Sequence, residues 1–281
     1  MNTINEIYID IYNKLKNFTS ARIETELIIS KTLNLDKIKI YVYPEKKLNE
    51  KELKLIYKNL NLRLNRIPLE YIFCEKEFFG FNFYVDKNVL IPRQETEFLV
   101  EEAIKLISCY KLKKIADIGT GCGNIAISII KNIQTKIKIY ATDISKEAIN
   151  VAKKNATMHN VLNKIEFVLT DKLKYFLDNS IILDMIVSNP PYVTEEEYKN
   201  LQPEIYYEPK IALVSPTGLE FYSYFAKHSK KVLKENGFLV LELNPNLYKE
   251  ICNIFKENKF CIYKTIYDYQ NLPRVIVVKN N

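Results

Sequence analysis

The chain has few residues of the kinds that bind metals. It contains two histidines, His159 and His228, and five cysteines at positions 74, 109, 122, 252 and 261. None of them forms the short C-x-x-C or H-x-x-x-H spacing that is typical of zinc sites. We therefore expect no metal site. Because the number of cysteines is odd and their spacing irregular, we also expect reduced thiols in a reducing compartment.

Long hydrophobic runs are absent as well. No uninterrupted apolar stretch approaches the roughly 20 residues of a membrane-spanning helix, and the first residues resemble no signal peptide. We expect a soluble cytoplasmic protein that does not engage a membrane. With 281 residues, of which 47% are hydrophobic and 27% charged, the chain is long and apolar enough to fold as one large domain, or as a catalytic domain with a smaller one.

Acidic residues are fewer than basic residues. The 41 Lys and Arg exceed the 34 Asp and Glu, which gives a net charge of +7. An excess of this size is consistent with an anionic partner such as RNA. It is equally consistent with a lysine-rich proteome, since Lys, Asn, Ile and Tyr are abundant and Trp is absent. The net charge alone leaves both interpretations open.

The first third of the chain shows the periodicity of helices. Apolar residues recur at helical spacing between Ile4 and Phe18 and again between Leu53 and Leu64, and residues 21–34 favour a further helix. We predict a small helical domain over residues 1–70. From Tyr71 the pattern changes to an aromatic-rich segment with Gly80 at its centre, which is typical of a β-hairpin. We predict a hairpin linker over residues 71–92.

Residues 93–281 alternate apolar runs with amphipathic segments. This alternation predicts a mostly parallel β-sheet with helices on both faces, and the last two runs, close together in sequence, predict an antiparallel pair. The expected strands are Ile115–Ile118, Ile137–Ala141, Ile165–Leu169, Met185–Val187, Phe238–Leu243, Tyr263–Tyr269 and Arg274–Val278. The expected helices include Gln94–Cys109, Asn124–Ile133, Lys146–Met158 and Leu219–Lys234.

Three of only six glycines fall within five residues, at Gly119, Gly121 and Gly123. They follow a predicted strand and precede a predicted helix, where glycines let a ligand approach the helix N-terminus. Their G-x-G-x-G spacing differs from the G-x-G-x-x-G of dinucleotide sites. Asp143 ends the next strand, where its carboxylate is placed to accept both ribose hydroxyls of an adenosine-containing ligand. The alternative is a tight turn with an unrelated acid.

Two further acids end strands of the same series. Asp117 lies just before the glycines, and we expect it either to hold the loop or to meet the amino-acid end of the ligand. Asp171 follows the third strand, where we expect it beside the adenine. Both assignments depend on the carboxyl ends of parallel strands meeting at one edge of the sheet.

After the fourth strand comes Asn189-Pro190-Pro191-Tyr192. Asn189 precedes a proline and is therefore held extended, while the prolines leave carbonyl acceptors with few competing N–H donors. An amino group could donate one hydrogen to the Asn189 side chain and one to the Pro190 carbonyl, with Tyr192 as a flat wall near a sulfonium cation. This arrangement favours methylation of a planar nitrogen, in which holding the nitrogen in place supplies most of the rate. The alternative is that the segment is only a Pro-Pro turn at the end of the strand, with Tyr192 as a packing residue.

These two motifs together resemble the class I S-adenosylmethionine-dependent amino-methyltransferases. Further segments resemble the release factor glutamine methyltransferase family (PrmC/HemK), and the resemblance spans nearly the whole chain. They are Arg66–Ile72, Glu77–Gly80, Leu90–Arg93 followed by Glu95-Thr96-Glu97, Glu208-Pro209-Lys210 and Gly218–Tyr222.

The resemblance implies a Rossmann-like α/β fold with a seven-stranded, mostly parallel sheet and an antiparallel C-terminal strand. It implies methyl transfer from S-adenosylmethionine, leaving S-adenosylhomocysteine, to N5 of the glutamine in the Gly-Gly-Gln loop of class 1 peptide chain release factors. It implies that Asn189, Pro190, Pro191 and Tyr192 hold the glutamine amide and that the N-terminal helices bind the release factor. The implied cofactor contacts are Asp117, Gly119, Thr120, Gly121, Cys122, Gly123, Asp143, Asp171, Lys172 and Asn189.

Lys172 departs from the family, in which several members carry an aromatic residue at this position beside the adenine. We expect a monomer that needs no nucleic acid. Alternatives are methylation of a glutamine in a ribosomal protein and, from the same tetrad, methylation of an adenine or cytosine amino group in nucleic acid. A dehydrogenase is disfavoured by the glycine spacing, and a non-catalytic RNA-binding module by the intact tetrad.

Overall fold

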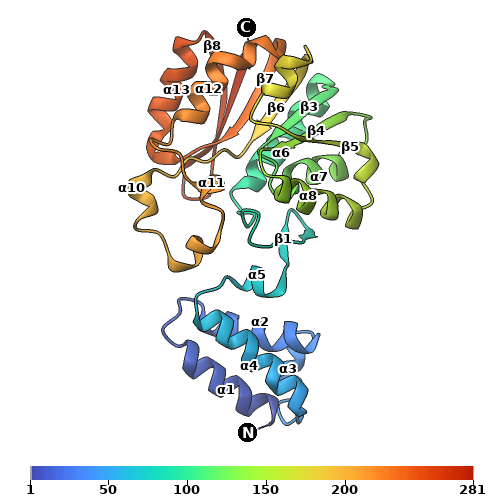
Figure 1. The fold of residues 1–281 in the computed structure, drawn as a ribbon, viewed down its shortest axis with the longest axis vertical. Helices are drawn as coiled ribbons and strands as arrows, with labels where there is room; N and C mark the ends of the chain where they lie inside the picture. The colour runs from blue at the N-terminus through green and yellow to red at the C-terminus, as the bar shows by residue number, and fades with distance from the viewer. Residues whose placement is uncertain (1, 281) are drawn as a thin grey trace. The chain divides into compact units, whose positions relative to one another are not determined.

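The computed structural model describes residues 2–280, which divide into two compact units. The first contains the chain up to Cys74 together with the separate segment Pro203–Tyr207. The second contains Glu75–Gln202 and the chain from Glu208 onward. Each unit has its own hydrophobic core, and the two are described separately (Figure 1).

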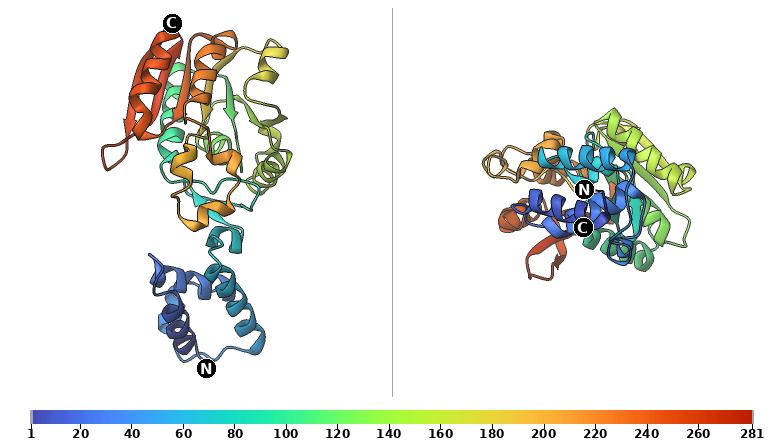
Figure 2. Two further views of the ribbon diagram at one scale, coloured as in Figure 1. Left: turned by 60° about the vertical axis from the view of Figure 1, so that its left-hand side comes forward. Right: turned by 90° about the horizontal axis from the view of Figure 1, so that it is seen from below.

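The first unit is helical. Helices α1, α2 and α4 pack side by side (Figures 1 and 2). Capping boxes begin two of them, at Thr3 with Glu6 and at Asn49 with Glu52, and such boxes satisfy N–H groups that a helix leaves unpaired. The helices are α1 (Ile4–Leu15), α2 (Ala21–Leu33), α3 (Ile38–Val42), α4 (Glu50–Leu64) and α5 (Leu69–Phe73).

The short 3-10 segment Pro203–Tyr207 is tied to this unit by charge. The side chain of Arg63 is buried, and it binds Glu24 at 2.7 Å and Glu204 at 2.8 Å. The hydroxyl of Tyr207 donates to the carbonyl of Asn65 at 2.6 Å. A segment far along the chain therefore completes the first unit.

The second unit opens with the predicted hairpin. Strands β1 (Lys76–Phe78) and β2 (Phe81–Phe83) are antiparallel, and the two turn residues Phe79 and Gly80 both have positive φ, 53° and 76°. Two positive φ values define a type I′ turn, whose twist suits a hairpin. Phe78 and Phe83 are buried in the core of the second unit, so the hairpin is anchored there.

A seven-stranded sheet forms the centre of the second unit, in the order β5-β4-β3-β6-β7-β9-β8. Only β9 runs antiparallel to its neighbours β7 and β8, which confirms the predicted mostly parallel sheet with an antiparallel C-terminal strand. The strands are β3 (Lys114–Ile118), β4 (Lys138–Asp143), β5 (Ile165–Leu169), β6 (Leu183–Ser188), β7 (Leu233–Glu242), β8 (Phe260–Tyr267) and β9 (Pro273–Asn280).

Helices cover both faces of the sheet, each over its own core. Alternate strand residues divide between the cores, as the period of two requires: Ile115 belongs to the core under α6 and α7, and Ala116 to the core under α12 and α13. These helices are visible in Figure 1. The helices of this unit are α6 (Thr96–Tyr110), α7 (Asn124–Asn132), α8 (Lys146–Met158), α9 (Lys174–Asp178), α10 (Glu195–Tyr198), α11 (Lys210–Leu213), α12 (Glu220–His228) and α13 (Tyr248–Glu257).

One predicted helix is too long. The helix expected over Leu219–Lys234 ends at His228, and a 3-10 turn at Ser229–Lys231 leads into β7. The carbonyl of Val232 accepts the N–H of Leu183 in β6, so pairing with the sheet ends the helical pattern. None of the helices described between residues 2 and 280 combines the length and apolarity that crossing a bilayer requires.

Candidate active site

The glycine-rich loop joins β3 to α7. Gly119, Gly121 and Gly123 all have positive φ, at 73°, 55° and 84°, a conformation that L side chains rarely adopt. A Cβ atom added at Gly119 or Gly121 would meet nothing within 4 Å. The loop therefore offers open space beside its backbone, and its third glycine leads directly into the helix.

Asp117, near the end of β3, forms a hydrogen bond with the glycine-rich loop. Its side chain is fully buried, and its Oδ2 accepts the hydroxyl proton of Thr120 at 2.6 Å. Burial raises the pKa of Asp117 to about 7. Of the two roles expected for Asp117, the structure shows the loop contact. Thr120 and Cys122 are buried within the same loop.

Asp143 ends β4 beside the loop. Its two carboxylate oxygens accept the backbone N–H groups of Gly121 and Ser145, each at 2.9 Å. Burial raises the pKa of Asp143, and the backbone hydrogen bonds oppose that shift. A carboxylate oxygen has two lone pairs, so Asp143 can still accept hydroxyl groups of a ligand.

Asn155 of α8 binds the glycine loop, and no motif or periodicity in the sequence identifies it as a site residue. Its side-chain NH2 donates to the carbonyls of Cys122 at 2.8 Å and Tyr84 at 2.9 Å, while its oxygen accepts the N–H of Tyr84 at 2.7 Å. One buried amide of α8 therefore joins the glycine loop to the chain that leaves the hairpin.

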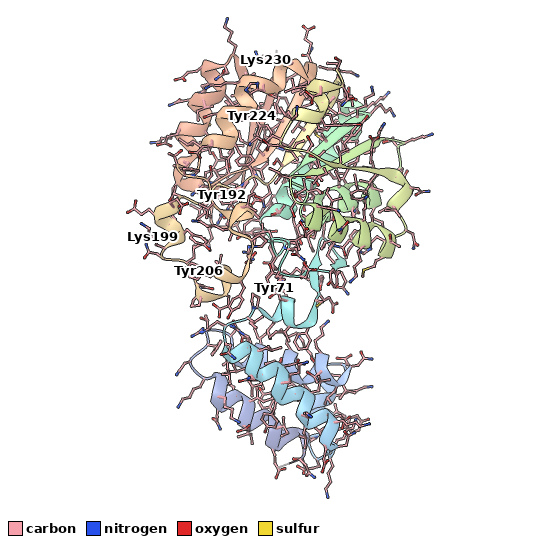
Figure 3. All side chains as sticks on the ribbon, in the orientation of Figure 1. Tyr71, Tyr192, Lys199, Tyr206, Tyr224 and Lys230 are labelled. Atoms are coloured by element: carbon pink, nitrogen blue, oxygen red, sulfur yellow. The ribbon has the colours of Figure 1, made fainter. Side chains whose placement is uncertain are left out.

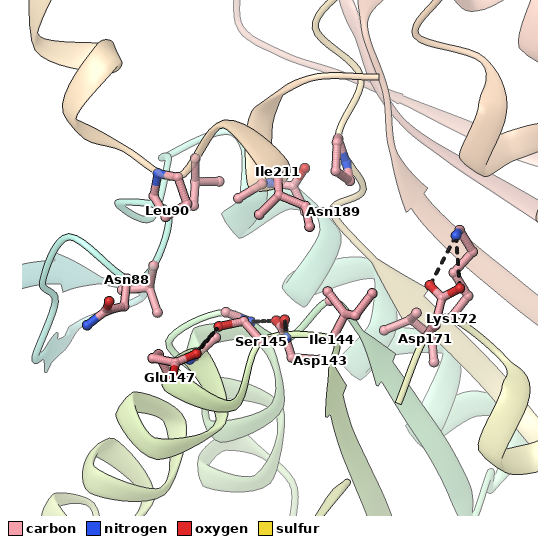
Figure 4. Close-up of a pocket in the computed structure, with 18 of the residues that line it drawn as sticks. Asn88, Leu90, Asp143, Ile144, Ser145, Glu147, Asp171, Lys172, Asn189 and Ile211 are labelled. Atoms are coloured by element: carbon pink, nitrogen blue, oxygen red, sulfur yellow. Dashed lines mark hydrogen bonds and ion pairs between the residues drawn. The ribbon is translucent and has the colours of Figure 1, made fainter. Parts of the chain in front are cut away.

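A cavity of about 530 Å³ lies over these strand ends, within the size range of small-molecule sites. Figure 4 shows Asn189 and Ile211 across the cavity from Asp143 and Ser145. Several lining residues were expected, and these are Gly119, Gly121, Asp143, Asp171, Lys172, Asn189 and Pro191. Asp117, Thr120, Cys122, Gly123, Pro190 and Tyr192 are not among the described residues that line it.

Apolar walls of this cavity were not foreseen. Ile144 directly follows Asp143 and lines the cavity with a half-exposed side chain. Phe221, from the start of α12, lines it as well. An apolar residue directly after a strand-end acid is a sequence signal that could have identified Ile144, whereas Phe221 reaches the cavity only through the tertiary fold.

Lys172 lies at the edge of the cavity beside Asp171. Its ammonium group binds the Asp171 carboxylate at 3.0 Å (Figure 4). The same group lies 5.0 Å from the ring centre of Phe221 and 5.3 Å from that of Tyr224, which is labelled in Figure 3. An aromatic ring is thus present at this edge, supplied by α12.

Asn189 follows β6 and donates its side-chain Nδ2 hydrogen to Oγ1 of Thr96 at 3.1 Å. Within the described part of the chain, the Asn189 Oδ1 atom and the Pro190 carbonyl accept no hydrogen bond. Two acceptors are thus left unused at neighbouring positions, one of them on a residue that faces the cavity. They match the two hydrogens of a planar –NH2 group.

Tyr192 is held by its hydroxyl. It donates to Oε1 of Glu242 at 2.9 Å, and Glu242 also accepts the Thr96 hydroxyl at 2.6 Å. Burial, together with Glu242, raises the pKa of Tyr192 well above its usual value. Tyr192, labelled in Figure 3, packs against the core under α12 and α13. Neither Thr96 nor Glu242 was identified as a site residue from the sequence.

Arg93 pairs with a buried carboxylate. Its guanidinium binds Glu208 at 2.6 Å, and the other oxygen of Glu208 accepts the N–H of Ile91 at 3.0 Å. Arg93 therefore joins the segment after the hairpin to the segment before α11.

Comparison with known proteins adds family relationships to this geometry. Residues 94–264 match the family model of the methyltransferase small domain, and residues 7–73 match that of the PrmC N-terminal domain. The first match alone covers more than half of the chain.

Two relatives of similar length carry the same name, release factor glutamine methyltransferase. The protein from Dictyoglomus turgidum is 40% identical over 280 residues, covering 98% of each chain. The protein from Chlorobaculum tepidum is 35% identical over 267 residues, covering 92% of this chain and 90% of the relative.

Solved structures resemble the fold at low sequence identity. The hMettl16 catalytic domain has a TM-score of 0.55 at 18% identity, covering 83% of this chain and 82% of that one. A methyltransferase from Pyrococcus furiosus has a TM-score of 0.50 at 15% identity, covering 72% and 90%. These likenesses confirm the predicted class of fold.

Proposed function

Because this chain belongs to the release factor glutamine methyltransferase family, we propose that it transfers a methyl group from S-adenosylmethionine to N5 of the glutamine in the Gly-Gly-Gln loop of class 1 release factors. The observation that carries the proposal is the pair of unused acceptors, Asn189 Oδ1 and the Pro190 carbonyl, beside a cavity that contains a glycine loop and Asp143. The product would support translation termination.

The residues of the cavity fit S-adenosylmethionine. The open backbone at Gly119 and Gly121 admits a ligand close to the start of α7, and Asp143 can accept the ribose hydroxyls. Ile144 and Phe221 offer apolar surface to a flat base. When bound, this cofactor supplies an electrophilic methyl group on a sulfonium sulfur. Asp171 and Lys172 are proposed to lie at the adenine end, and Asp117, Thr120, Cys122 and Gly123 to shape the loop.

The tetrad positions the acceptor nitrogen. Asn189 Oδ1 and the Pro190 carbonyl would each accept one hydrogen of the substrate carboxamide, which turns the face of its nitrogen toward the donor methyl, and one of these two hydrogens would leave as a proton when the nitrogen gains the methyl group. Pro191 and Tyr192 fix the path of this segment, with the Tyr192 hydroxyl held by Glu242. Because a carboxamide nitrogen is a weak nucleophile, positioning supplies most of the rate.

We assign recognition of the release factor to residues 1–70, with 71–92 as linker and 93–281 as the catalytic domain. In the first unit Ile38, Tyr41, Val42 and Tyr43 are all more than half exposed, which leaves an apolar surface around α3. The double substitution Tyr41→Ser, Val42→Ser is expected to raise KM for the release factor and leave kcat unchanged. An unchanged KM would contradict this assignment of α3.

An acceptor assay tests the function. The protein is incubated with methyl-labelled S-adenosylmethionine and, separately, with a class 1 release factor, the same factor with its Gly-Gly-Gln glutamine replaced by alanine, ribosomal proteins and RNA. Mass spectrometry then locates the label. We expect label on the Gly-Gly-Gln glutamine and none on the alanine variant. Label only on a ribosomal protein or on RNA would replace the proposed substrate.

The same preparation tests the remaining expectations. We propose that the protein is a monomer and needs no nucleic acid. We also propose that it acts in the cytoplasm, because its substrate works on the ribosome. Light scattering should give the mass of one chain, near 33.1 kDa, and treatment with nuclease should leave the rate unchanged. A dimer mass or a rate lost after nuclease treatment would contradict the respective expectation.

A further inference from the structure

A buried carboxylate lies behind the tetrad, outside the residues that line the cavity. Glu242 is the last residue of β7, and its side chain is almost completely buried. Its two oxygens accept the hydroxyl protons of Thr96 at 2.6 Å and Tyr192 at 2.9 Å. Neither Glu242 nor Thr96 lines the cavity, yet Thr96 contacts Asn189, which does.

The direction of each hydrogen bond in this chain follows from the number of protons. An ionised carboxylate can only accept, and a threonine hydroxyl has a single proton. Because Thr96 gives that proton to Glu242, it can only accept from Asn189. The Asn189 side chain must therefore present its NH2 group to Thr96, as the 3.1 Å contact from Nδ2 has it. Its oxygen is then the atom available to a substrate.

We propose that Glu242 is a positioning residue for methyl transfer, which through Thr96 fixes the Asn189 carboxamide with its oxygen available to the acceptor amide and which directly holds the Tyr192 hydroxyl. This inference rests on the proposed function and deepens it. Glu242 does not touch the reacting atoms. It determines that the Asn189 carboxamide offers its oxygen, and not its NH2 group, to the substrate.

The protonated form of Glu242 would reverse the arrangement. A neutral carboxyl group can donate its proton to Thr96, and the Thr96 hydroxyl is then free to donate to Asn189. The Asn189 carboxamide would turn over to accept it and would present NH2 toward the substrate. An amide NH2 group donates hydrogen bonds but accepts none, so it could not hold the NH2 group of the substrate. The ionised form of Glu242 is therefore the working form.

The surroundings of Glu242 bring this change near neutral pH. Burial raises the pKa of Glu242 to about 7, with Glu95 at the start of α6 acting in the same direction. The hydroxyls of Thr96 and Tyr192 oppose the shift, as does Arg274 of β9. Tyr222 of α12 donates its hydroxyl to the backbone carbonyl of Glu242 rather than to the carboxylate.

Substitutions at Thr96 test the orientation step. Thr96→Ser keeps the hydroxyl and is expected to hold kcat within about threefold, whereas the isosteric Thr96→Val removes it and is expected to lower kcat about tenfold or more. The affinity for S-adenosylmethionine, measured by calorimetry, should change less than about threefold in both. Thr96→Val that turns over as fast as the wild type would overturn the proposal.

The pH profile tests the role of Glu242 itself. The wild type should lose kcat as the pH falls through about 7, and Glu242→Gln should show a lower rate without that acidic limb. Asp117, whose pKa burial also raises to about 7, is a competing source of the limb. A Glu242→Gln variant that keeps the wild-type limb would overturn the assignment to Glu242.

A spectroscopic readout does not depend on turnover. The side-chain NH2 resonances of Asn189, assigned by comparison with Asn189→Ala, should shift with pH near 7 in the wild type and stay constant in Glu242→Gln. Resonances that titrate alike in both proteins would overturn the proposal. A wild type that methylates no release factor but shows this titration would overturn the proposed function and leave the orientation of Asn189 intact.

Discussion

The burial of Glu242 has a measurable consequence for stability. Its pKa rises from 4.5 to about 7 on folding, so the folded protein binds this proton more tightly than the unfolded chain. The neutral form therefore stabilises the fold at low pH, and that stabilisation is lost as the pH rises from about 4.5 through 7. Glu242→Gln is neutral at every pH and removes this dependence.

The size of the effect follows from the shift. The rise in the pKa of Glu242 corresponds to about 3 kcal/mol in total, of which roughly 2–3 kcal/mol falls between pH 5 and pH 8. The free energy of unfolding of Glu242→Gln, relative to that of the wild type, should rise by this amount over that interval. Constant effects of the substitution, including its altered hydrogen bonds, do not contribute to the change with pH.

Urea unfolding of both proteins at several pH values measures this difference. The chain has no Trp, so far-UV circular dichroism is a suitable probe. Asp117 and Asp143 titrate in both proteins and cancel in the difference. Glu235→Gln, at an exposed position on the same strand, is the matched control for the loss of one carboxylate from β7. A constant difference for Glu242→Gln would refute the reasoning.

Three further predictions concern the cavity. Asn189→Ala should abolish methyl transfer while retaining most of the cofactor affinity, and exposed Asn200→Ala should retain both in a radiolabel assay. Asp143→Ala should weaken the binding of S-adenosylmethionine by about 1.5–3 kcal/mol, which is roughly 10- to 150-fold in Kd. Asp178→Ala is the surface control. If calorimetry gives Asp143→Ala the same affinity as this control, Asp143 does not belong to the site. Phe221→Ala should raise that Kd several-fold, through about 0.5–1.5 kcal/mol of lost aromatic contact, with kcat at saturation unchanged.

Much of the fold was predictable because its signals are local. The strand, glycine cluster and helix around Gly119–Gly123 are contiguous in sequence, as are β6 and the tetrad, and the helix over Lys146–Met158 was predicted with the boundaries it has. The hairpin followed from a glycine between aromatic residues. In each case one short window contains the whole pattern, so no knowledge of the tertiary fold is needed.

The missed features are those that depend on residues far apart in sequence. Thr96 and Glu242 are 146 residues apart, and Thr96 and Asn189 are 93 apart. Lys172 was noted as a departure at the adenine position, but only the fold reveals that Phe221 of α12 brings an aromatic ring to the same edge. No periodicity or motif encodes such pairings.

The cost of burying Glu242 is an argument for its role. A glutamine of nearly the same shape would avoid the loss of about 3 kcal/mol in the free energy of unfolding above pH 7. However, its side chain carries both a donor and an acceptor. Its NH2 group could donate to Thr96 and thereby free the Thr96 proton for Asn189, which is the reversed arrangement. Only an acceptor-only group forces both hydroxyls to donate. A carboxylate at this position therefore exchanges stability for a single orientation of the residue that holds the substrate.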